Sequence, residues 1–231
     1  MRKELGDIDD IQAIDKLLRV AGLNLIDVGC GTGRMSRELV TRGANVIGIE
    51  PDPLQVAKNR AASEVPGLRL VETEATTLPA EDDSIDGVFF FRSLHHIAVA
   101  DMDAALAEAA RVLKPNSGFI YVVEPAMTGS HFPVSRPFND ETSVRTEAQA
   151  ALARASDTLD ADMTTYVYVQ HSRYADFEAL VERATGQTFN DINREDVETD
   201  EVRALFEAGR SDDGDYVFDQ PMLLNLFSRV G

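Results

Sequence analysis

A glycine-rich loop flanked by carboxylates is the part of this 231-residue sequence best suited to chemistry. The run Asp-Val-Gly-Cys-Gly-Thr-Gly at residues 27–33 follows a segment that predicts a strand and precedes one that predicts a helix. Three alternating glycines clear side chains from one side of the turn, so backbone N–H groups can approach a ligand. Glu50 ends the next predicted strand, where its carboxylate can accept hydrogen bonds from both hydroxyls of a ribose. Loop and acid together predict a cofactor that carries a nucleoside.

The spacing of the glycines separates the candidate cofactors. A nicotinamide site uses G-x-G-x-x-G, but Arg34 stands at the position of that third glycine, and the motif is G-x-G-x-G. Asp27 at the end of the strand would repel a pyrophosphate, whereas it suits a cationic or zwitterionic ligand. S-adenosylmethionine carries both a sulfonium charge and an amino acid end, so the sequence favours it over a dinucleotide.

Several ordered motifs over roughly residues 23–125 make the chain resemble the class I S-adenosylmethionine-dependent methyltransferases, in particular their small-molecule branch. The motifs are residues 27–33, Glu50-Pro51, Glu74-Ala75 with Leu78-Pro79, Asp-Ser-Ile-Asp at 83–86, Ser-Leu-His-His-Ile at 93–97 and Arg-Val-Leu-Lys-Pro at 111–115. The chain departs from the family pattern in having Glu74 where Asp is usual. It also has Asn-Ser-Gly at 116–118 where Gly-Gly is usual.

The resemblance implies a role for each residue of the cofactor site. Asp27 and the backbone around the loop glycines would hold the methionine part, Glu50 the ribose, and Glu74 with the Ala75 amide the adenine; Glu72 is an alternative to Glu74. The full predicted set is Asp27, Gly29, Cys30, Gly31, Thr32, Gly33, Glu50, Pro51, Glu74, Ala75, Arg92 and Ser93, the last two at the mouth of the site. We interpret Cys30 as a small loop residue rather than a nucleophile.

Two adjacent histidines, His95 and His96, follow the fourth predicted strand and are the candidate catalytic residues. A neutral imidazole there could remove a proton from a hydroxyl or amine, although packing is the alternative reading. The candidates for binding the methyl acceptor are His131, Arg136, Asp140 and Arg145. Their cluster could instead cap the helix that begins near Glu141. No metal site is predicted.

Alternating strand and helix patterns predict the elements that position these residues. Apolar runs at 23–28, 44–50, 68–72, 87–91 and 118–124 alternate with helical patterns, which is typical of a doubly wound parallel sheet. We expect an α/β, Rossmann-like, mostly parallel seven-stranded sheet with helices on both faces. The expected segments are an N-terminal helix (1–22), the cofactor-binding core (23–125), an inserted substrate lid after the fifth strand (126–172), and C-terminal helices and strands that complete the sheet (173–231).

The composition narrows the class of protein. A net charge of -18 disfavours nucleic acid as a partner. The acidity of the region after Pro125 favours a neutral or cationic acceptor over an anionic one. No stretch is long and apolar enough for a membrane span, so we expect a cytoplasmic protein, as a monomer or homodimer. The leading hypothesis is methyl transfer to an O, N or C atom of a small molecule, by in-line displacement with release of S-adenosylhomocysteine. The alternatives are a non-catalytic S-adenosylmethionine-binding regulatory module and a nicotinamide-dependent oxidoreductase.

Overall fold

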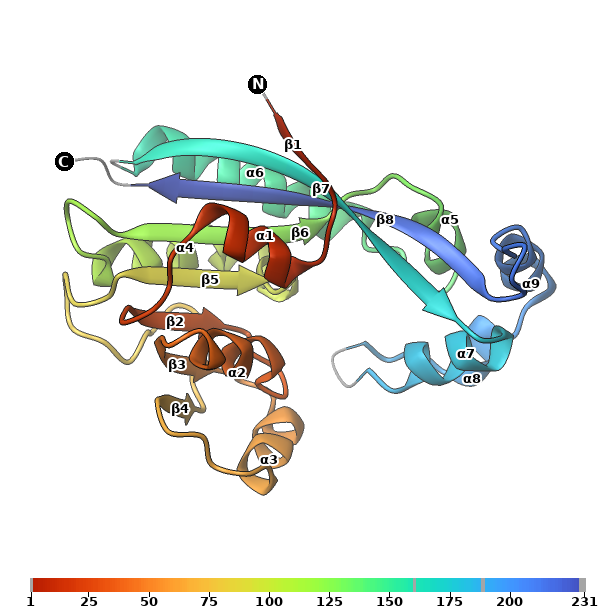
Figure 1. Cartoon of the computed structure of the whole chain (residues 1–231), viewed down its shortest axis with the longest axis horizontal. Coiled ribbons are helices and arrows are strands. Elements are labelled where there is room, and N and C mark those ends of the chain that lie inside the picture. The colour runs from red at the N-terminus through yellow and green to blue at the C-terminus, as the bar shows by residue number, and fades with distance from the viewer. Residues whose placement is uncertain (1, 160, 188–189, 229–231) are drawn as a thin grey trace.

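A single mixed sheet organises the computed structural model, which describes residues 2–159, 161–187 and 190–228. Its strand order is β1-β7-β8-β6-β5-β2-β3-β4 (Figure 1). The strands are β1 (Lys3–Asp7), β2 (Asn24–Val28), β3 (Asn45–Ile49), β4 (Leu68–Val71), β5 (Gly87–Phe91), β6 (Phe119–Pro125), β7 (Asp162–Tyr174) and β8 (Tyr216–Ser228). Among these strands β8 alone runs antiparallel to its neighbours. The predicted α/β class with a mostly parallel sheet is therefore confirmed.

The prediction of seven strands is wrong, because the described residues form a sheet of eight. The additional strand, β1, lies within the segment that we predicted as an N-terminal helix, and it pairs in parallel with β7 at the edge of the sheet. Its sequence, KELGD, has no apolar alternation, so the strand could not be recognised without its pairing with the edge of β7. The helix itself, α1 (Asp10–Leu17), begins at a capping box between Asp9 and Gln12.

Helices cover both faces of the sheet. On one face α4 (Met102–Val112) and α6 (Thr142–Thr158) pack against alternate residues of the central strands, and on the other α1 and α2 (Arg34–Thr41) do so. The helix α3 (Pro53–Ala61) lies beside the edge strand β4. The alternation is visible along β2, where Leu25 faces one core and Ile26 the other.

The helix α6 belongs to the main core, although the sequence analysis places it in an inserted segment. Its buried face consists of small residues and one leucine, which pack with α4 in the same apolar cluster as the sheet: Ala148, Ala151, Leu152 and Ala155. Because alanines allow two helices to approach closely, this polar-looking helix can still bury one side. β7, which follows it, lies inside the sheet.

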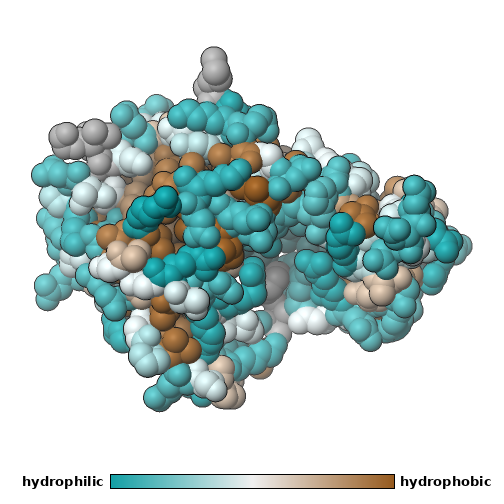
Figure 2. All heavy atoms as spheres, viewed as in Figure 1, coloured by the Kyte–Doolittle hydropathy of each residue, from teal (hydrophilic) through white to brown (hydrophobic). Residues whose placement is uncertain are grey.

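A second, smaller lobe stands at the carboxyl ends of the parallel strands (Figures 1 and 2). It contains α5 (His131–Ser135), α7 (Phe177–Thr185), α8 (Arg194–Val197) and α9 (Asp200–Glu207), and we call it the cap. β7 and β8 carry it, because they pair over all 13 residues whereas β6 pairs with β8 only as far as Met222. The cap has its own apolar core around Phe206 and Phe218. Among the described residues no helix is long and apolar enough to cross a membrane.

Candidate functional site

The loop between β2 and α2 adopts a conformation that depends on its glycines. Gly29, Gly31 and Gly33 all have positive φ, at 68°, 55° and 76°, a region that other residues reach only with strain. A Cβ on Gly29 would lie 2.6 Å from Cβ of Ser93, whereas a Cβ on Gly31 would meet nothing within 4 Å. Gly29 therefore lets the ends of β2 and β5 approach each other. Gly31 keeps the space beside the loop open.

Asp27 lies at the end of β2 with only 1% of its surface exposed. Ser36 Oγ donates a hydrogen bond to Oδ2 at 2.6 Å, while Oδ1 is buried and has no hydrogen-bond partner among the described residues. Burial raises the pKa of this carboxyl to about 7, the Ser36 hydrogen bond opposes that rise, and the nearby charge of Glu50 adds to it. An unpartnered carboxylate oxygen in such a place is suited to a cationic group of a ligand.

Glu50 and Glu74 lie on two further sides of the same space. Glu50 accepts backbone N–H bonds from Gly31 at 2.8 Å and from Asp52 at 3.0 Å, which fixes its carboxylate beside the loop. Each carboxylate oxygen can accept a second hydrogen bond. Glu74 is exposed and lines the cavity, whereas Glu72 forms an ion pair with Arg60 at 3.0 Å. The geometry thus supports Glu74 over Glu72 at the predicted adenine position.

These residues line a cavity of about 720 Å³ at the carboxyl ends of β2, β3 and β5. Of the predicted cofactor-binding residues all but Gly33 line it, and Gly33 instead stands at the N-terminus of α2. Burial and the charges of Asp27 and Glu50 raise the pKa of the Cys30 thiol, in keeping with a loop residue that stays protonated. The volume lies within the range of about 300–1,000 Å³ typical of small-molecule sites.

Arg92 separates this cavity from a second one. It follows β5 with a φ of 57°, and its Nη2 donates to Oδ2 of Asp10 at 2.6 Å and to Oε1 of Gln170 at 2.5 Å. Tyr168 OH donates to the other oxygen of Asp10 at 2.6 Å. Sequence reasoning missed Asp10 and Gln170, because they come from α1 and β7, far from any motif.

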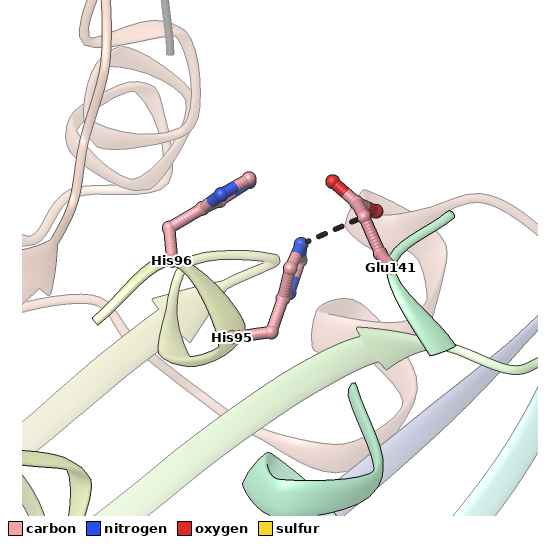
Figure 3. Close-up of side chains that lie close together, drawn as sticks. All are labelled: His95, His96 and Glu141. Atoms are coloured by element: carbon pink, nitrogen blue, oxygen red, sulfur yellow. Dashed lines mark ion pairs between the residues drawn. The ribbon is translucent and has the colours of Figure 1, made fainter. Parts of the chain in front are cut away.

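His95 is held by a buried carboxylate. Its Nδ1 is hydrogen-bonded to Oε2 of Glu124, the penultimate residue of β6, and the two side chains are 3% and 1% exposed. Oε1 of Glu124 accepts the Leu94 N–H at 3.1 Å, so the carboxylate is anchored to the short helix η1 (Leu94–His96). This pairing directs Nε2 of His95 toward Glu141, 3.7 Å away (Figure 3). The sequence did carry a signal for Glu124, an acid at the end of a buried strand like Glu50.

His96 lies beside His95, with the two ring centroids 4.1 Å apart. It lines both cavities, whereas His95 lines only the second. Desolvation by the neighbouring protein atoms lowers the pKa of His96 most, and the charge of His95 lowers it further. The charge of Glu141 acts in the opposite direction.

The second cavity, of about 210 Å³, lies between η1 and the cap. It shares Arg92, His96 and Gln187 with the first cavity, so the two are adjacent. Of the residues predicted to bind the acceptor, His131 and Arg145 line it. Arg136 and Asp140 do not: their side chains are 61% and 48% exposed and form an ion pair with each other at 3.3 Å. They lie in the segment that joins α5 to α6.

Further residues of this cavity carried no sequence motif. Glu141 and Tyr174 line it, and Tyr174 OH lies 2.9 Å from Nε2 of His131. Arg183 and Gln187 come from α7 and the residues after it, so the cap completes the wall. The sequence analysis expects helices in the C-terminal segment, but nothing in the sequence indicated which strand ends α7 faces.

His95, His96 and Glu141 are also suitable in type for binding a metal ion, since one ligand atom of each lies within 4.8 Å of the others. The Glu141 carboxylate is already engaged, however, because Arg145 Nη2 donates to its Oε2 at 2.5 Å. That guanidinium would repel a cation at the same oxygen. The geometry is therefore better suited to proton transfer than to metal binding.

The larger cavity lies at the carboxyl edge of a doubly wound sheet, and its carboxylates suit a cationic ligand. These features are typical of an α/β protein that binds a cofactor. Comparisons with known proteins give the family. Residues 26–121 match the family model described as a methyltransferase domain. An uncharacterised methyltransferase of Mycobacterium tuberculosis is 36% identical over 104 residues, 45% of this chain and 41% of that protein. The ubiquinone/menaquinone biosynthesis C-methyltransferase UbiE of Brucella abortus is 30% identical over 178 residues, 71% of this chain and 61% of that protein.

A solved structure shows the same fold over nearly the whole chain. It is a putative methyltransferase from an antibiotic biosynthesis pathway of Anabaena variabilis, with a TM-score of 0.70 and 17% identity, covering 94% of this chain and 96% of that one. Residues 26–121 therefore form a methyltransferase domain of the class that the motifs predicted. The chain spans about two fifths of the length of the mycobacterial relative and about three fifths of that of UbiE.

Proposed function

We propose that this protein transfers a methyl group from S-adenosylmethionine to a small molecule held in the cavity beneath the cap. The observation that carries the proposal is Asp27, whose buried Oδ1 lacks a partner and whose side chain lines the larger cavity. A buried carboxylate without a full set of partners is costly, and a cationic ligand would relieve that cost. The methyltransferase family supports the same cofactor.

The residues present fit the parts of this cofactor. Asp27 suits the ammonium group, the free acceptor capacity of Glu50 suits the ribose hydroxyls, and Glu74 with the Ala75 amide suits the adenine edge. When bound, S-adenosylmethionine supplies a methyl group on a sulfonium, and the electrons of the broken C–S bond remain on sulfur. The chain has to align an acceptor with that carbon and exclude water from the reacting groups.

We assign the removal of the acceptor proton to His95. Glu124 accepts a hydrogen bond from Nδ1, which leaves the lone pair of neutral His95 on Nε2, toward the smaller cavity. As the acceptor oxygen or nitrogen forms its bond to the methyl carbon, its proton moves to Nε2. Glu124 is then a positioning residue, because it holds the tautomer and stabilises the imidazolium that forms.

Calorimetry with S-adenosylmethionine, S-adenosylhomocysteine and NAD tests the cofactor. We expect the first two to bind and NAD not to bind. Binding of NAD without the other two would refute the proposal. Release of S-adenosylhomocysteine in the presence of small acceptors then tests for catalysis, and its absence across a broad panel would favour the non-catalytic binding module instead.

Glu124→Gln tests the role of His95. We expect the rate of methyl transfer to fall by about 10²- to 10⁴-fold, the usual contribution of a positioned base, with cofactor affinity unchanged. Glu124→Asp should restore part of the rate, and the acid limb of the pH–rate profile should shift in Glu124→Gln. Loss of cofactor affinity equal to the loss of rate would indicate a structural role instead.

A further inference from the structure

Three arginines converge on the smaller cavity of this strongly acidic protein. Arg92 comes from the end of β5, Arg145 from α6 and Arg183 from α7, and all three line the cavity. Among the described lining residues Glu141 is the one carboxylate. The charge of the cavity is therefore opposite in sign to the net charge of -18 of the whole chain.

Two of these arginines have hydrogen-bond donors that the described protein atoms do not use. Arg92 is paired with Asp10, and Arg145 is paired with Glu141 and lies with its guanidinium carbon 5.9 Å from the centre of the Phe132 ring. In both, the Nε atom is buried and has no hydrogen-bond acceptor in the described parts of the chain. Each guanidinium therefore retains capacity to donate.

Arg183 has no carboxylate within ion-pair distance among the described residues. Its guanidinium carbon lies 5.4 Å from the centre of the Tyr174 ring, which is itself part of the cavity wall. An arginine that is positioned by an aromatic ring and lacks an acidic partner is well placed for the anionic group of a ligand.

His131 reports the combined effect of the three arginines. Burial lowers its pKa to about 4, and the charges of Arg183, Arg145 and Arg92 act in the same direction. The positive charges of all three arginines therefore act on the imidazole of His131 in the cavity wall. A positive potential that disfavours an imidazolium there would favour an anion.

We propose that the methyl acceptor is a small organic acid whose carboxylate binds Arg183 with support from Arg145. The inference rests on the proposed function and specifies the substrate class of the same site. The cavity volume of about 210 Å³ limits the acceptor to a compact molecule. With its carboxylate at Arg183, the nucleophilic hydroxyl or amine of the acceptor would lie near Nε2 of His95, and His96 and Arg92 line the boundary with the larger cavity.

Matched acid and amide pairs test this proposal on the intact protein. We expect benzoate to bind S-adenosylhomocysteine-loaded protein and benzamide to bind at least 10-fold more weakly by calorimetry. In the release assay, 4-hydroxybenzoate and anthranilate should be preferred over their primary amides. A neutral amide that binds or reacts as well as the acid would overturn the proposal, as would binding of inorganic phosphate in preference to benzoate.

Arg183→Gln tests the assigned partner, with Arg136→Gln as its control because Arg136 lies outside both cavities. Arg183→Gln should weaken benzoate binding by about 10- to 100-fold, the effect of losing one charge-assisted contact, and should abolish the preference for acid over amide. Arg136→Gln should leave both unchanged. An unaltered preference in Arg183→Gln refutes the inference even when methyl transfer occurs, whereas failure to bind S-adenosylmethionine refutes the proposed function.

Discussion

Replacing Asp27 by asparagine should stabilise the fold of the cofactor-free protein while weakening cofactor binding. The carboxyl is buried, its pKa is raised to about 7 from an ordinary 3.8, and Ser36 can still donate to the oxygen of an asparagine. Below about pH 4 the carboxyl is protonated in both folded and unfolded chains, so it does not affect their balance. Between that pH and about 7 the unfolded chain loses the proton while the folded chain keeps it, so stability falls as pH rises.

The size of the effect follows from the width of this interval. A rise of about three pH units corresponds to about 4 kcal/mol, which becomes fully expressed above pH 7. Relaxation of the site and entry of water reduce the penalty, so we expect Asp27→Asn to gain about 2–4 kcal/mol at pH 8 and little at pH 4. The variant should meanwhile lose about 1.5–3 kcal/mol of S-adenosylmethionine affinity, the cost of one charge-assisted hydrogen bond.

Urea unfolding of cofactor-free protein at pH 4, 6 and 8 measures the difference in unfolding free energy between wild type and Asp27→Asn. Asp212→Asn is the control, because it removes the same charge from an exposed turn. The difference in unfolding free energy between wild type and variant removes the contributions of the other titrating groups, because both proteins share them. A gain for Asp27→Asn that is absent at pH 8, or independent of pH, would refute the idea that a buried charge is held ready for the cofactor.

Two further predictions concern the loop and the helical layer. Gly29→Ala should lower the unfolding free energy by about 2–4 kcal/mol through its positive φ and its contact with Ser93. The added methyl group of Gly31→Ala meets no neighbour, so this variant should lower the unfolding free energy by only about 1–2 kcal/mol and chiefly reduce cofactor affinity. Urea denaturation measures the first effect and calorimetry the second. Equal losses of stability in Gly29→Ala and Gly31→Ala would contradict the argument. Leu152→Ala should cost about 2–5 kcal/mol in urea unfolding, because Leu152 is 1% exposed in the main core. A loss below 1 kcal/mol would mean that α6 is a loosely attached lid.

The sequence was most informative where function depends on consecutive residues. The glycine loop, Asp27 and Glu50 were predictable because each follows a recognisable strand, and parallel strands bring their carboxyl ends to one edge. Glu124 obeys the same rule at the end of β6 and could have been found by it. β1 was not predictable in this way, because its pairing depends on β7, more than 150 residues later in the chain.

The smaller cavity was least predictable, because the cap forms part of its wall. Arg183 and Tyr174 come from a lobe carried on the ends of β7 and β8, and no local pattern shows that this lobe faces η1. The alanine face of α6 is a different case. Ala148, Ala151 and Ala155 recur at helical spacing, but their low hydrophobicity hid a face that packs closely against α4.

The charge of the smaller cavity favours a different acceptor from the one that the acidity of the sequence favours. The acids after Pro125 favour a neutral or cationic molecule if every acid is counted equally. Screening limits exposed charges to about 8–10 Å at physiological salt, so acids spread over the exterior contribute little inside a cavity walled by protein. Arg92, Arg145 and Arg183 line that cavity directly, while Asp10 and Glu141 hold two of them in place. The larger cavity has the opposite arrangement, with Asp27, Glu50 and Glu74 in its wall. A cationic donor beside an anionic acceptor is the pair of ligands that these two adjacent charge patterns favour.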